Sequence, residues 1–389
     1  MITLPPAEWT QREDLATLVT VLGADNLRWV GGAVRDTLLQ SEVGDIDAAT
    51  PLEPQEVMAR LKEAGIRVVP TGIDHGTVTA LPGNGPVEIT TLRQDVSTDG
   101  RRATVAFAQD WREDAARRDF TINALYADPR TLEIFDYFGG LADLDARRVR
   151  FIGDARQRIR EDHLRILRYY RFQARFGAEL DAGAEEACAE LAPMLKGLSR
   201  ERVAMELLNL LGLPDPHDTV QRMYDRGVLP VVLPEAGAEQ LAALASLIAE
   251  ERQQDIAPDA LRRLAALLPA DPRVAEPVAA RLRLSAAQRK RLVTAASREG
   301  APMDARALAY RIGREEALDR LLLAGADTTA LDRWNIPQLP LKGGEIVARG
   351  VSAGPDVARI LREVERRWVE EGFPGRDRVD AMLVEILDV

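Results

Sequence analysis

Short apolar runs alternate with amphipathic stretches over the first 145 residues of the chain. Runs of apolar and β-branched residues that are bounded by Gly or Pro are typical of short strands. The predicted strands are residues 28–30, 45–48, 67–70, 77–81 and 87–92. Apolar positions at helical spacing predict two helices, at residues 33–40 and 54–64. The pattern therefore predicts an α/β head, residues 1–145, that is built on a small sheet.

From residue 154 onward, apolar positions recur at helical spacing almost without interruption. The predicted helices are residues 159–176, 182–195, 199–211, 219–226, 239–251, 259–268, 285–298, 304–312, 314–323, 355–371 and 376–387. A chain of 389 residues is long enough for two or more domains. We expect an all-α neck, body and tail after the head. The expected ranges are residues 146–215 for the neck, 216–300 for the body and 301–389 for the tail.

The composition is that of an ordinary soluble globular protein, with 46% hydrophobic and 29% charged residues. No apolar run approaches the length that a membrane-spanning helix needs, so we expect no contact with a membrane. The first nine residues lack the pattern of a signal peptide, and we expect a cytoplasmic protein. Cys188 is the only cysteine, which excludes a disulfide within the chain and a cysteine-based zinc site. No segment indicates an obligate protein partner.

Charge is unevenly distributed along the chain. The formal net charge is −11, which taken alone argues against binding to nucleic acid. Residues 100–175, however, contain sixteen arginines, no lysine and twelve acidic residues, and so carry a local charge of +4. A basic segment on an acidic protein can still bind phosphates. The alternative is that these arginines lie on solvated helix faces, as most charged runs do.

Three carboxylates and a glycine pair form the first candidate site. Gly31 and Gly32 follow a predicted strand and would let the backbone approach a phosphate closely. Asp45 and Asp47 are two residues apart on a strand, so both side chains project to one face, where they repel unless a cation lies between them. Glu88 lies in another predicted strand, and hard oxygen ligands of this kind suit Mg²⁺. These residues predict metal-assisted nucleotidyl transfer; the alternative is a solvated loop with an edge strand.

A dense polar cluster at residues 117–123 is the second candidate site. Arg117 and Arg118 could clamp the oxygens of a triphosphate, because a guanidinium donates bidentate hydrogen bonds. Asp119 and Asn123 are four residues apart, so on a helix they share one face and could bind a ribose. The alternative is the charged start of a helix with ordinary ion pairs.

The third candidate site lies at residues 161–168. Asp162 and Arg165 are three residues apart and would share a helix face. A carboxylate accepts hydrogen bonds whereas a guanidinium only donates them, so the pair complements an amino group beside a ring-nitrogen acceptor. Cytosine and adenine present that pattern, and guanine and uracil present the opposite one. The pair could therefore select C and A; the alternative is a structural salt bridge.

With these motifs the chain resembles the class II tRNA nucleotidyltransferases, the bacterial and eukaryotic CCA-adding type that also includes bacterial poly(A) polymerases. This family belongs to the DNA polymerase β-type nucleotidyltransferase superfamily. The matching segments are residues 30–36, 44–47, 117–125, 136–140, 150–154, 160–165 and 198–202. Jointly these motifs are highly specific. The resemblance implies a polymerase β-type sheet with helices in the head, followed by a helical neck, body and tail that grip tRNA.

The resemblance also implies a two-metal mechanism. Asp45 and Asp47 would bind two Mg²⁺ ions, and Glu88 would assist near the primer terminus. The terminal 3′-hydroxyl of a tRNA would attack the α-phosphate of CTP or ATP, and pyrophosphate would leave. The partners would be the tRNA acceptor end, CTP and ATP, and the product would be a tRNA that ends in CCA.

Nucleotide-binding and tRNA-binding residues follow from the same resemblance. Glu161 would hold Arg165 in place while the base is read. The implied nucleotide-binding residues are Gly32, Arg35, Arg117, Arg118, Asp119, Asn123, Glu161, Asp162, Arg165 and Arg168. Residues 93–107 resemble the flexible loop of the family, whose presence favours full CCA addition. The candidate tRNA contacts are Arg101, Arg102, Arg289, Lys290 and Lys342.

Other functions stay open on the sequence alone. Within the same family, the chain could be a poly(A) polymerase or an enzyme that adds only A or only CC. It could also be a catalytically inactive RNA-binding homologue, although a complete set of three carboxylates argues against that. A small-molecule nucleotidyltransferase would share the carboxylates but would not need residues 161–165 or the long helical half.

Overall fold

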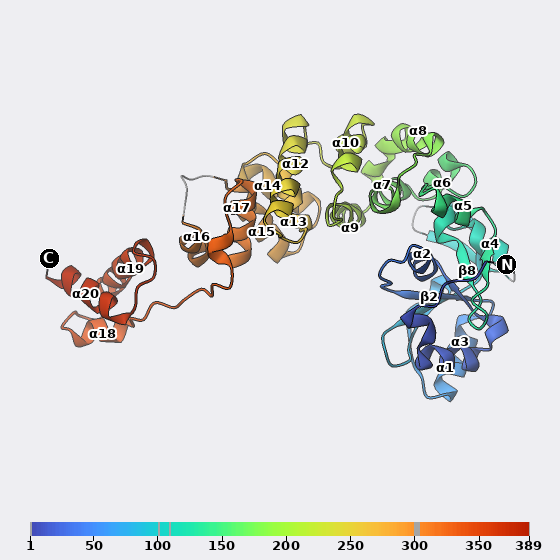
Figure 1. The fold of residues 1–389 in the computed structure, drawn as a ribbon, viewed down its shortest axis with the longest axis horizontal. Coiled ribbons are helices and arrows are strands. Elements are labelled where there is room, and N and C mark those ends of the chain that lie inside the picture. The colour runs from blue at the N-terminus through green and yellow to red at the C-terminus, as the bar shows by residue number, and fades with distance from the viewer. Residues whose placement is uncertain (1, 100–101, 109, 299–303, 389) are drawn as a thin grey trace. The chain divides into compact units, whose positions relative to one another are not determined.

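The computed structural model describes residues 2–99, 102–108, 110–298 and 304–388, and residues 94–106 by their backbone path alone. The chain forms two compact units. Met1–Leu210 with Asp218–Pro234 is the N-terminal unit, and Leu211–His217 with Glu235–Val389 is the C-terminal unit. In the described ranges all strands lie in the N-terminal unit, and helices follow (Figure 1). The predicted fold class is confirmed, and the finer division into head, neck, body and tail stays a prediction.

A mixed sheet of seven strands forms the core of the described head, in the order β3-β4-β5-β2-β1-β8-β9. Its strands are β1 (Arg28–Val30), β2 (Ile46–Thr50), β3 (Arg67–Gly72), β4 (Thr77–Leu81), β5 (Val87–Thr91), β8 (Leu125–Ala127) and β9 (Ile134–Asp136). Strands β2 and β5 are parallel, and the other neighbours are antiparallel. The five predicted strands are all present. The sequence does not predict β8 and β9, because three residues are too few to show an alternating pattern.

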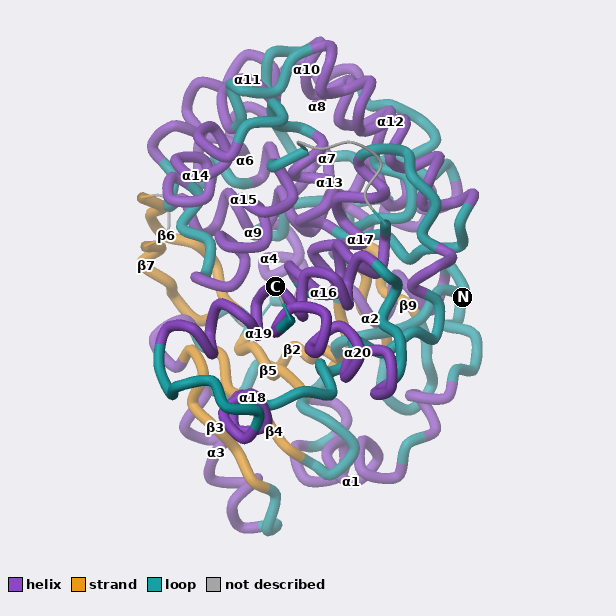
Figure 2. The backbone as a smooth tube through the Cα atoms, turned by 90° about the vertical axis from the view of Figure 1, so that its left-hand side faces the viewer, coloured by secondary structure: helices purple, strands orange, loops and turns teal. Residues whose placement is uncertain are grey.

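The hairpin of β6 (Arg93–Asp99) and β7 (Arg102–Phe107) forms a separate two-stranded sheet (Figure 2). Its backbone pairing is antiparallel. The segment that resembles the flexible loop, residues 93–107, therefore has strand pairing along much of its described backbone. The reason is that a polar segment can satisfy its backbone groups by pairing with itself, which its composition does not reveal.

The head helices lie on both sides of the seven-stranded sheet, and alternate side chains point to opposite faces of it. The helices are α1 (Glu13–Leu22), α2 (Gly32–Leu38), α3 (Pro54–Glu63), α4 (Trp111–Ala116) and α5 (Gly140–Asp145). Trp29 of β1 points toward Leu15 of α1, and α3 lies beside α1 (Figure 1). Val30 and Tyr126, which are register partners on β1 and β8, point the other way and pack with Trp111. The candidate catalytic residues lie on this second face.

The turn at residues 136–140 fixes the segment that carries the polar cluster. Asp136 Oδ1 accepts hydrogen bonds from the amides of Gly139 and Gly140, each at 2.9 Å. A Cβ atom added to Gly140 would lie 2.3 Å from the carbonyl oxygen of Thr121. Glycine at this position therefore allows α5 to approach the backbone at Thr121.

The helices that follow, up to residue 234, are α6 (Ala155–Glu161), α7 (Arg165–Phe176), α8 (Ala182–Leu191), α9 (Arg200–Leu211), α10 (His217–Asp225) and α11 (Leu229–Val232). Two predicted helices are interrupted. The prediction of one helix over 159–176 is wrong, because Asp162 adopts extended angles, φ −150° and ψ 105°, that end α6. The predicted helix 182–195 stops early, because Pro193 cannot donate a helical hydrogen bond and a 3₁₀ turn follows.

A chain of polar contacts joins α2 of the head to α7 and α9. Arg35 Nη1 donates to Asn123 Oδ1. Asn123 Nδ2 donates to Asp119 Oδ1 at 3.0 Å, and Arg168 Nε donates to Asp119 Oδ2 at 2.7 Å. Arg168 Nη1 also lies 3.5 Å from Glu206 Oε1 on α9. Asp119 and Glu206 thus share one guanidinium, which compensates the cost of burying their charges.

The C-terminal unit is helical over most of its described residues. Its helices are α12 (Ala238–Gln253), α13 (Ala260–Ala266), α14 (Pro272–Arg281), α15 (Ala286–Ala296), α16 (Ala305–Ile312), α17 (Arg314–Leu323), α18 (Gly343–Ala348), α19 (Pro355–Glu370) and α20 (Arg376–Leu387). The sequence does not predict α14, because Pro277 in its interior lacks the amide that a helix normally uses there. Among the described helices, none is long and apolar enough to cross a membrane.

Buried charges hold α12, α13, α15 and α17 together. Arg262 donates to Glu251 at 2.7 Å and to Asp319 at 2.9 Å. Arg291 donates to Asp319 at 2.6 Å, and Arg263 pairs with Glu251 at 2.8 Å. The side chains of Glu251 and Asp319 are at most 2% exposed, so loss of a facing arginine would leave a buried carboxylate uncompensated.

We expect Gly140→Ala to lower the free energy of unfolding by about 2 kcal/mol, because overpacking a tight contact costs about 1–3 kcal/mol. Urea unfolding followed by circular dichroism measures this change. Gly197→Ala is the matched control, because a Cβ atom there would meet nothing within 4 Å. Equal stability of the two variants would contradict the assignment of a close contact at Gly140.

The stability of the N-terminal unit should depend on pH through Asp119. Burial raises the pKa of Asp119, but the facing Arg168 and Asn123 outweigh it and lower the pKa to about 2. This shift from the ordinary value contributes about 2 kcal/mol, complete above pH about 4 and lost as the pH falls toward 2. Asp119→Asn should therefore destabilise the protein at pH 7, by a margin that shrinks as the pH falls below 4.

Urea unfolding at pH 7, 5 and 3.5 tests the role of Asp119. Glu186→Gln is the control, because the Glu186 side chain is 73% exposed. A difference between wild type and Asp119→Asn that stays constant from pH 7 to 3.5 would show that the carboxylate is not held ionised by its partners.

Candidate active site

Three carboxylates meet on one face of the sheet. Asp47 of β2 and Glu88 of β5 are register partners in the parallel pair, so their side chains lie next to each other on the same face. Asp45 comes directly before β2, two residues from Asp47. Asp45 and Glu88 are exposed, whereas Asp47 is half-buried. The structure therefore brings the three predicted carboxylates to one surface.

The electrostatics of this face favour a cation. Burial, together with the negative charges of Glu88 and Asp45, raises the pKa of Asp47 to about 6, although Arg118 acts in the opposite direction. Carboxylates that repel in this way are relieved by a hard divalent ion, which prefers oxygen ligands. The described residues hold no group of three or more acidic, His or Cys side chains that could enclose a metal ion. A two-carboxylate site fits Mg²⁺, which usually takes only one or two carboxylates plus phosphate and water.

The glycine turn lies between the carboxylates and the arginines. Gly31 has a φ of +73°, which is strained for any residue with a Cβ atom. A Cβ atom there would lie 3.6 Å from Arg118 Nη1 and 3.9 Å from Asp47 Oδ2. Gly31 therefore borders the space between the two side chains of opposite charge. Gly32 follows it as the first residue of α2.

Asp114 holds the two predicted phosphate-binding arginines. Its carboxylate accepts from Arg117 Nε at 2.8 Å, from Arg118 Nη2 at 3.3 Å and from the Tyr126 hydroxyl at 2.6 Å. Burial raises the pKa of Asp114, but Arg118 and Arg117 outweigh it and hold the pKa below its ordinary value. Asp114 is not among the site residues predicted from the sequence. Sequence spacing could have indicated it, because Asp114 precedes Arg117 by three residues and Arg118 by four. On a helix this spacing places the three side chains next to one another.

The polar cluster at Asp119 is arranged differently from the prediction. Asp119 and Asn123 do not share an α-helical face, because α4 ends at Ala116 and a short 3₁₀ turn holds Asn123. They are nevertheless joined by a direct hydrogen bond of 3.0 Å. Arg35 is only 4% exposed and bonds to Asp36 and Asn123. Any effect of Arg35 on a nucleotide would therefore act through Asn123.

The predicted base-reading pair lies at the junction of two helices. Asp162 is not on a helix, so the expectation that it shares a helix face with Arg165 is wrong. Asp162 Oδ2 accepts from Arg202 Nη2 of α9 at 2.7 Å. Arg165, the first residue of α7, donates from Nη1 to Glu161 Oε2 at 2.6 Å. The structure thus contains the expected contact between Glu161 and Arg165, and adds Arg202, which no local spacing could indicate.

The candidate tRNA contacts are only partly described. Arg101 lies outside the described residues, and the side chain of Arg102 does too. Arg289 is paired with Glu276, and Lys290 beside it is exposed. Lys342 is exposed and is the N-cap of α18, where its amide donates to Glu345 at 2.9 Å. Their contact with tRNA stays a prediction.

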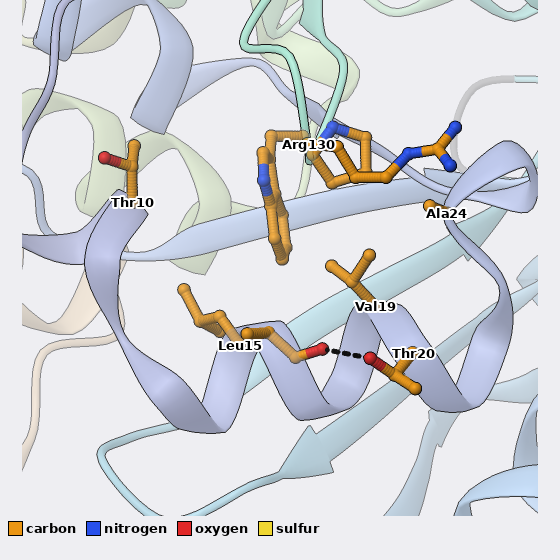
Figure 3. A pocket seen from close by; sticks show the side chains of 9 residues that line it. Thr10, Leu15, Val19, Thr20, Ala24 and Arg130 are labelled. Atoms are coloured by element: carbon orange, nitrogen blue, oxygen red, sulfur yellow. Dashed lines mark hydrogen bonds between the residues drawn. The ribbon is translucent and has the colours of Figure 1, made fainter.

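A pocket with a volume of about 350 Å³ lies on the opposite face of the sheet from the carboxylates. Figure 3 shows Leu15, Val19 and Thr20 on one side of this pocket and Arg130 on the other. Its lining residues are Thr10, Leu15, Ala16, Val19, Thr20, Ala24, Trp29, Pro129 and Arg130. None of them belongs to the three candidate sites, so the pocket is not the candidate active site.

Two family models match the chain. The poly A polymerase head domain matches residues 27–150, which contain the carboxylates and the arginines. The model described as "probable RNA and SrmB- binding site of polymerase A" matches residues 177–239. The first match covers all seven strands of the sheet and contains every residue of the first two candidate sites.

Several known proteins are similar over most of the chain. The human CCA tRNA nucleotidyltransferase 1, mitochondrial, is 34% identical over 385 residues, which is 93% of this chain and 87% of that protein. A CCA-adding enzyme of Streptococcus pyogenes is 40% identical over 211 residues, which is 54% of this chain and 51% of that protein.

Solved structures agree with the sequence comparison. The CCA-adding enzyme of Bacillus stearothermophilus in complex with CTP has a TM-score of 0.76 and 27% identity, covering 97% of both chains. The Thermotoga maritima CCA-adding enzyme complexed with tRNA has a TM-score of 0.70 at 19% identity, covering 100% of both chains, and shows the shared fold. With the carboxylates, the arginines and the glycine turn on one face of such a head, the chain belongs to the family of class II CCA-adding tRNA nucleotidyltransferases.

Proposed function

We propose that the protein adds CCA to the 3′ end of tRNA without a nucleic-acid template, using CTP and ATP and releasing pyrophosphate. The observation that carries this proposal is the space bordered by Gly31, where Asp47 and Arg118 lie on either side. A triphosphate needs both an acidic metal-holding side and a cationic side. Relatives named CCA tRNA nucleotidyltransferase and CCA-adding enzyme support the same activity.

Asp45 and Asp47 are the residues that would hold two Mg²⁺ ions, and their oxygen-only donor set fits that ion. Bound divalent ions would supply activation of the attacking hydroxyl and neutralisation of charge on the phosphates. Glu88 is close enough to Asp47 to add to the negative charge that recruits cations to this face. Its predicted place is beside the primer terminus.

Arg118 and Arg117 would bind the triphosphate oxygens. Burial lowers the pKa of Arg118, but Tyr126 and Asp114 outweigh it and raise the pKa above its ordinary value, so the guanidinium stays charged. Asp114 contacts Arg117 through Nε and Nη2 and Arg118 through Nη2, which leaves further N–H groups of both arginines for a ligand. The side chains are thereby fixed before a nucleotide binds, which lowers the entropy lost on binding.

Asp162 and Arg165 would read the Watson–Crick edge of the base. The acceptor and donor groups of this pair complement cytosine and adenine and not uracil or guanine. In this structure Asp162 is bonded to Arg202 and Arg165 to Glu161. When a base binds, Asp162 and Arg165 would therefore either keep Arg202 and Glu161 as additional partners or release them. Arg202 also supports the selection, because its hydrogen bond fixes the position of the Asp162 carboxylate.

An incorporation assay with Mg²⁺ and labelled CTP or ATP tests the proposed function. The primers are tRNAs that end at the discriminator base, at C and at CC, with oligo(A) alongside. Two Cs followed by one A, on tRNA alone, would establish CCA addition. A long A tract on oligo(A) would instead indicate a poly(A) polymerase, and a single A on the CC-ended tRNA an A-adding enzyme.

A cytoplasmic location stays a prediction, because the animal relatives are named mitochondrial.

We expect Asp45→Asn and Asp47→Asn each to reduce incorporation by at least about 1,000-fold, because each removes a charged metal ligand from the reacting centre. Single-turnover incorporation on CC-ended tRNA measures the loss. Asp74→Asn is the control, because Asp74 is an exposed carboxylate of the same unit. Circular dichroism checks that the variants fold, and near wild-type rates in either variant would refute the metal-ligand assignment.

Asp162→Ala should relax base selection. Loss of the acceptor removes the group that distinguishes an amino group from a carbonyl, a difference of about 1–3 kcal/mol. Competition between ATP or CTP and UTP or GTP on CC-ended tRNA measures the selectivity. Glu190→Ala on α8 is the control, since its side chain is 47% exposed. Unchanged rejection of UTP and GTP by Asp162→Ala would show that another residue reads the base.

A further inference from the structure

Arg158 of α6 connects the base-reading junction to the backbone of the phosphate-binding arginines. Its Nη2 atom donates to the carbonyl oxygens of both Arg117 and Arg118, the latter at 2.8 Å. Its Nη1 atom lies 2.6 Å from Glu161 Oε2. The same Glu161 oxygen accepts from Arg165 Nη1 at 2.6 Å, and Arg165 Nη2 donates to the Arg117 carbonyl at 3.3 Å. Two guanidiniums thus bridge one carboxylate and one pair of peptide carbonyls.

These contacts lie in a partly dry environment. The exposed fractions are 12% for the Arg158 side chain, 13% for Arg165 and 18% for Glu161. Hydrogen bonds to charged groups are stronger at such sites than in water, and an unpaired group there costs more. The network is therefore stiff, and each of its members depends on the others.

The carbonyls that Arg158 holds are those at the end of a helix. Arg117 caps the C-terminus of α4, where carbonyl groups lack helical partners and carry partial negative charge. A cation is favoured at such a helix end. Arg158 supplies it from α6, so it fixes the direction in which the chain leaves α4.

The side chains of Arg117 and Arg118 contact Asp114, whereas their backbone carbonyls contact Arg158. Both are held by Asp114 on α4, as described above, while their carbonyls are held by Arg158. The two peptide units are thus clamped from the α4 side and from the α6 side. A shift of Arg158 would rotate these peptides and move the guanidiniums away from the triphosphate.

We propose that Arg158 is a positioning residue that couples base recognition at Arg165 to triphosphate binding by Arg117 and Arg118. This inference rests on the proposed function, because it assigns Arg165 to the base and the other two arginines to the phosphates. A base that accepts a hydrogen bond from Arg165 draws this guanidinium away from Glu161 and the Arg117 carbonyl. Arg158 still contacts both of these acceptors. The phosphate-binding arginines therefore stay in place while the base is read.

The test compares Arg158→Met and Arg158→Lys with wild type. Arg156→Met is the matched control, because Arg156 lies on the same helix and pairs only with surface residues Glu190 and Glu186 in the described contacts. Competition against a fluorescent ATP analogue gives the Kd values of ATP, UTP and AMP. Single-turnover incorporation on CC-ended tRNA gives the rates with ATP and UTP.

We expect Arg158→Met to raise the Kd of ATP about tenfold and that of AMP less than about twofold, because the peptide carbonyls of the two triphosphate-binding arginines lose one to two charge-assisted hydrogen bonds. We also expect the preference for ATP over UTP to fall about tenfold. Arg158→Lys keeps the charge but cannot hold two carbonyls in a planar fork, so it should recover only part of both effects. Arg156→Met should behave as wild type.

Two results would overturn the proposal. If ATP and AMP binding weaken equally, or if ATP and UTP are affected equally, Arg158 does not couple the two sites. In a double-mutant cycle with Arg118→Met, additive losses would show that Arg158 does not act through Arg118. If Arg158→Met does not fold, wild-type selectivity in Arg158→Lys would also overturn the proposal.

These outcomes are separate from a failure of the proposed function. If wild type bound ATP but added no nucleotide to any tRNA, the CCA-adding activity would be wrong. The binding measurements would still decide whether Arg158 couples base and phosphate recognition.

Discussion

The candidate site depends on one buried carboxylate, Asp114, which is held by Arg117, Arg118 and the hydroxyl of Tyr126. A charge with 1% exposure is tolerated only because its partners compensate it. Asp114 also fixes the two arginine side chains, whose remaining N–H groups are available to a triphosphate. Tyr126 is on the sheet face that carries Asp47, so this contact also sets the distance between the cationic and the acidic sides.

The acidic side is set by strand register. Strands β2 and β5 are parallel, and Asp47 lies opposite Glu88. This register places two carboxylates next to each other although they repel. Burial, and then the neighbouring charge of Glu88, raise the pKa of Asp47. Strain of this kind is expected where a cation and an anionic substrate complete the site. The same sheet supports α1 and the pocket on its other face, away from the chemistry.

Much of the site could be predicted from local spacing. Asp45 and Asp47 are paired by the two-residue period of a strand, and Glu161 and Arg165 lie close enough in sequence to meet. Spacing failed where the chain changes structure, at Asp162 and at Asp119, because each lies beyond the end of a helix. The partner of Asp162 is Arg202, forty residues away, and only the packing of α9 beside the α6–α7 junction brings it there.

The sequence by itself determined the fold class, the motifs and the candidate residues for binding metal, phosphate and base. Those depend on composition and on contacts between residues close in the chain. The tertiary structure alone decided that Arg35 contacts Asn123, that Asp119 pairs with Arg168, and that Arg158 holds the carbonyls at residues 117 and 118. The physical reason is that long side chains with several donors can satisfy many acceptors, and which acceptors they reach depends on how separate helices pack.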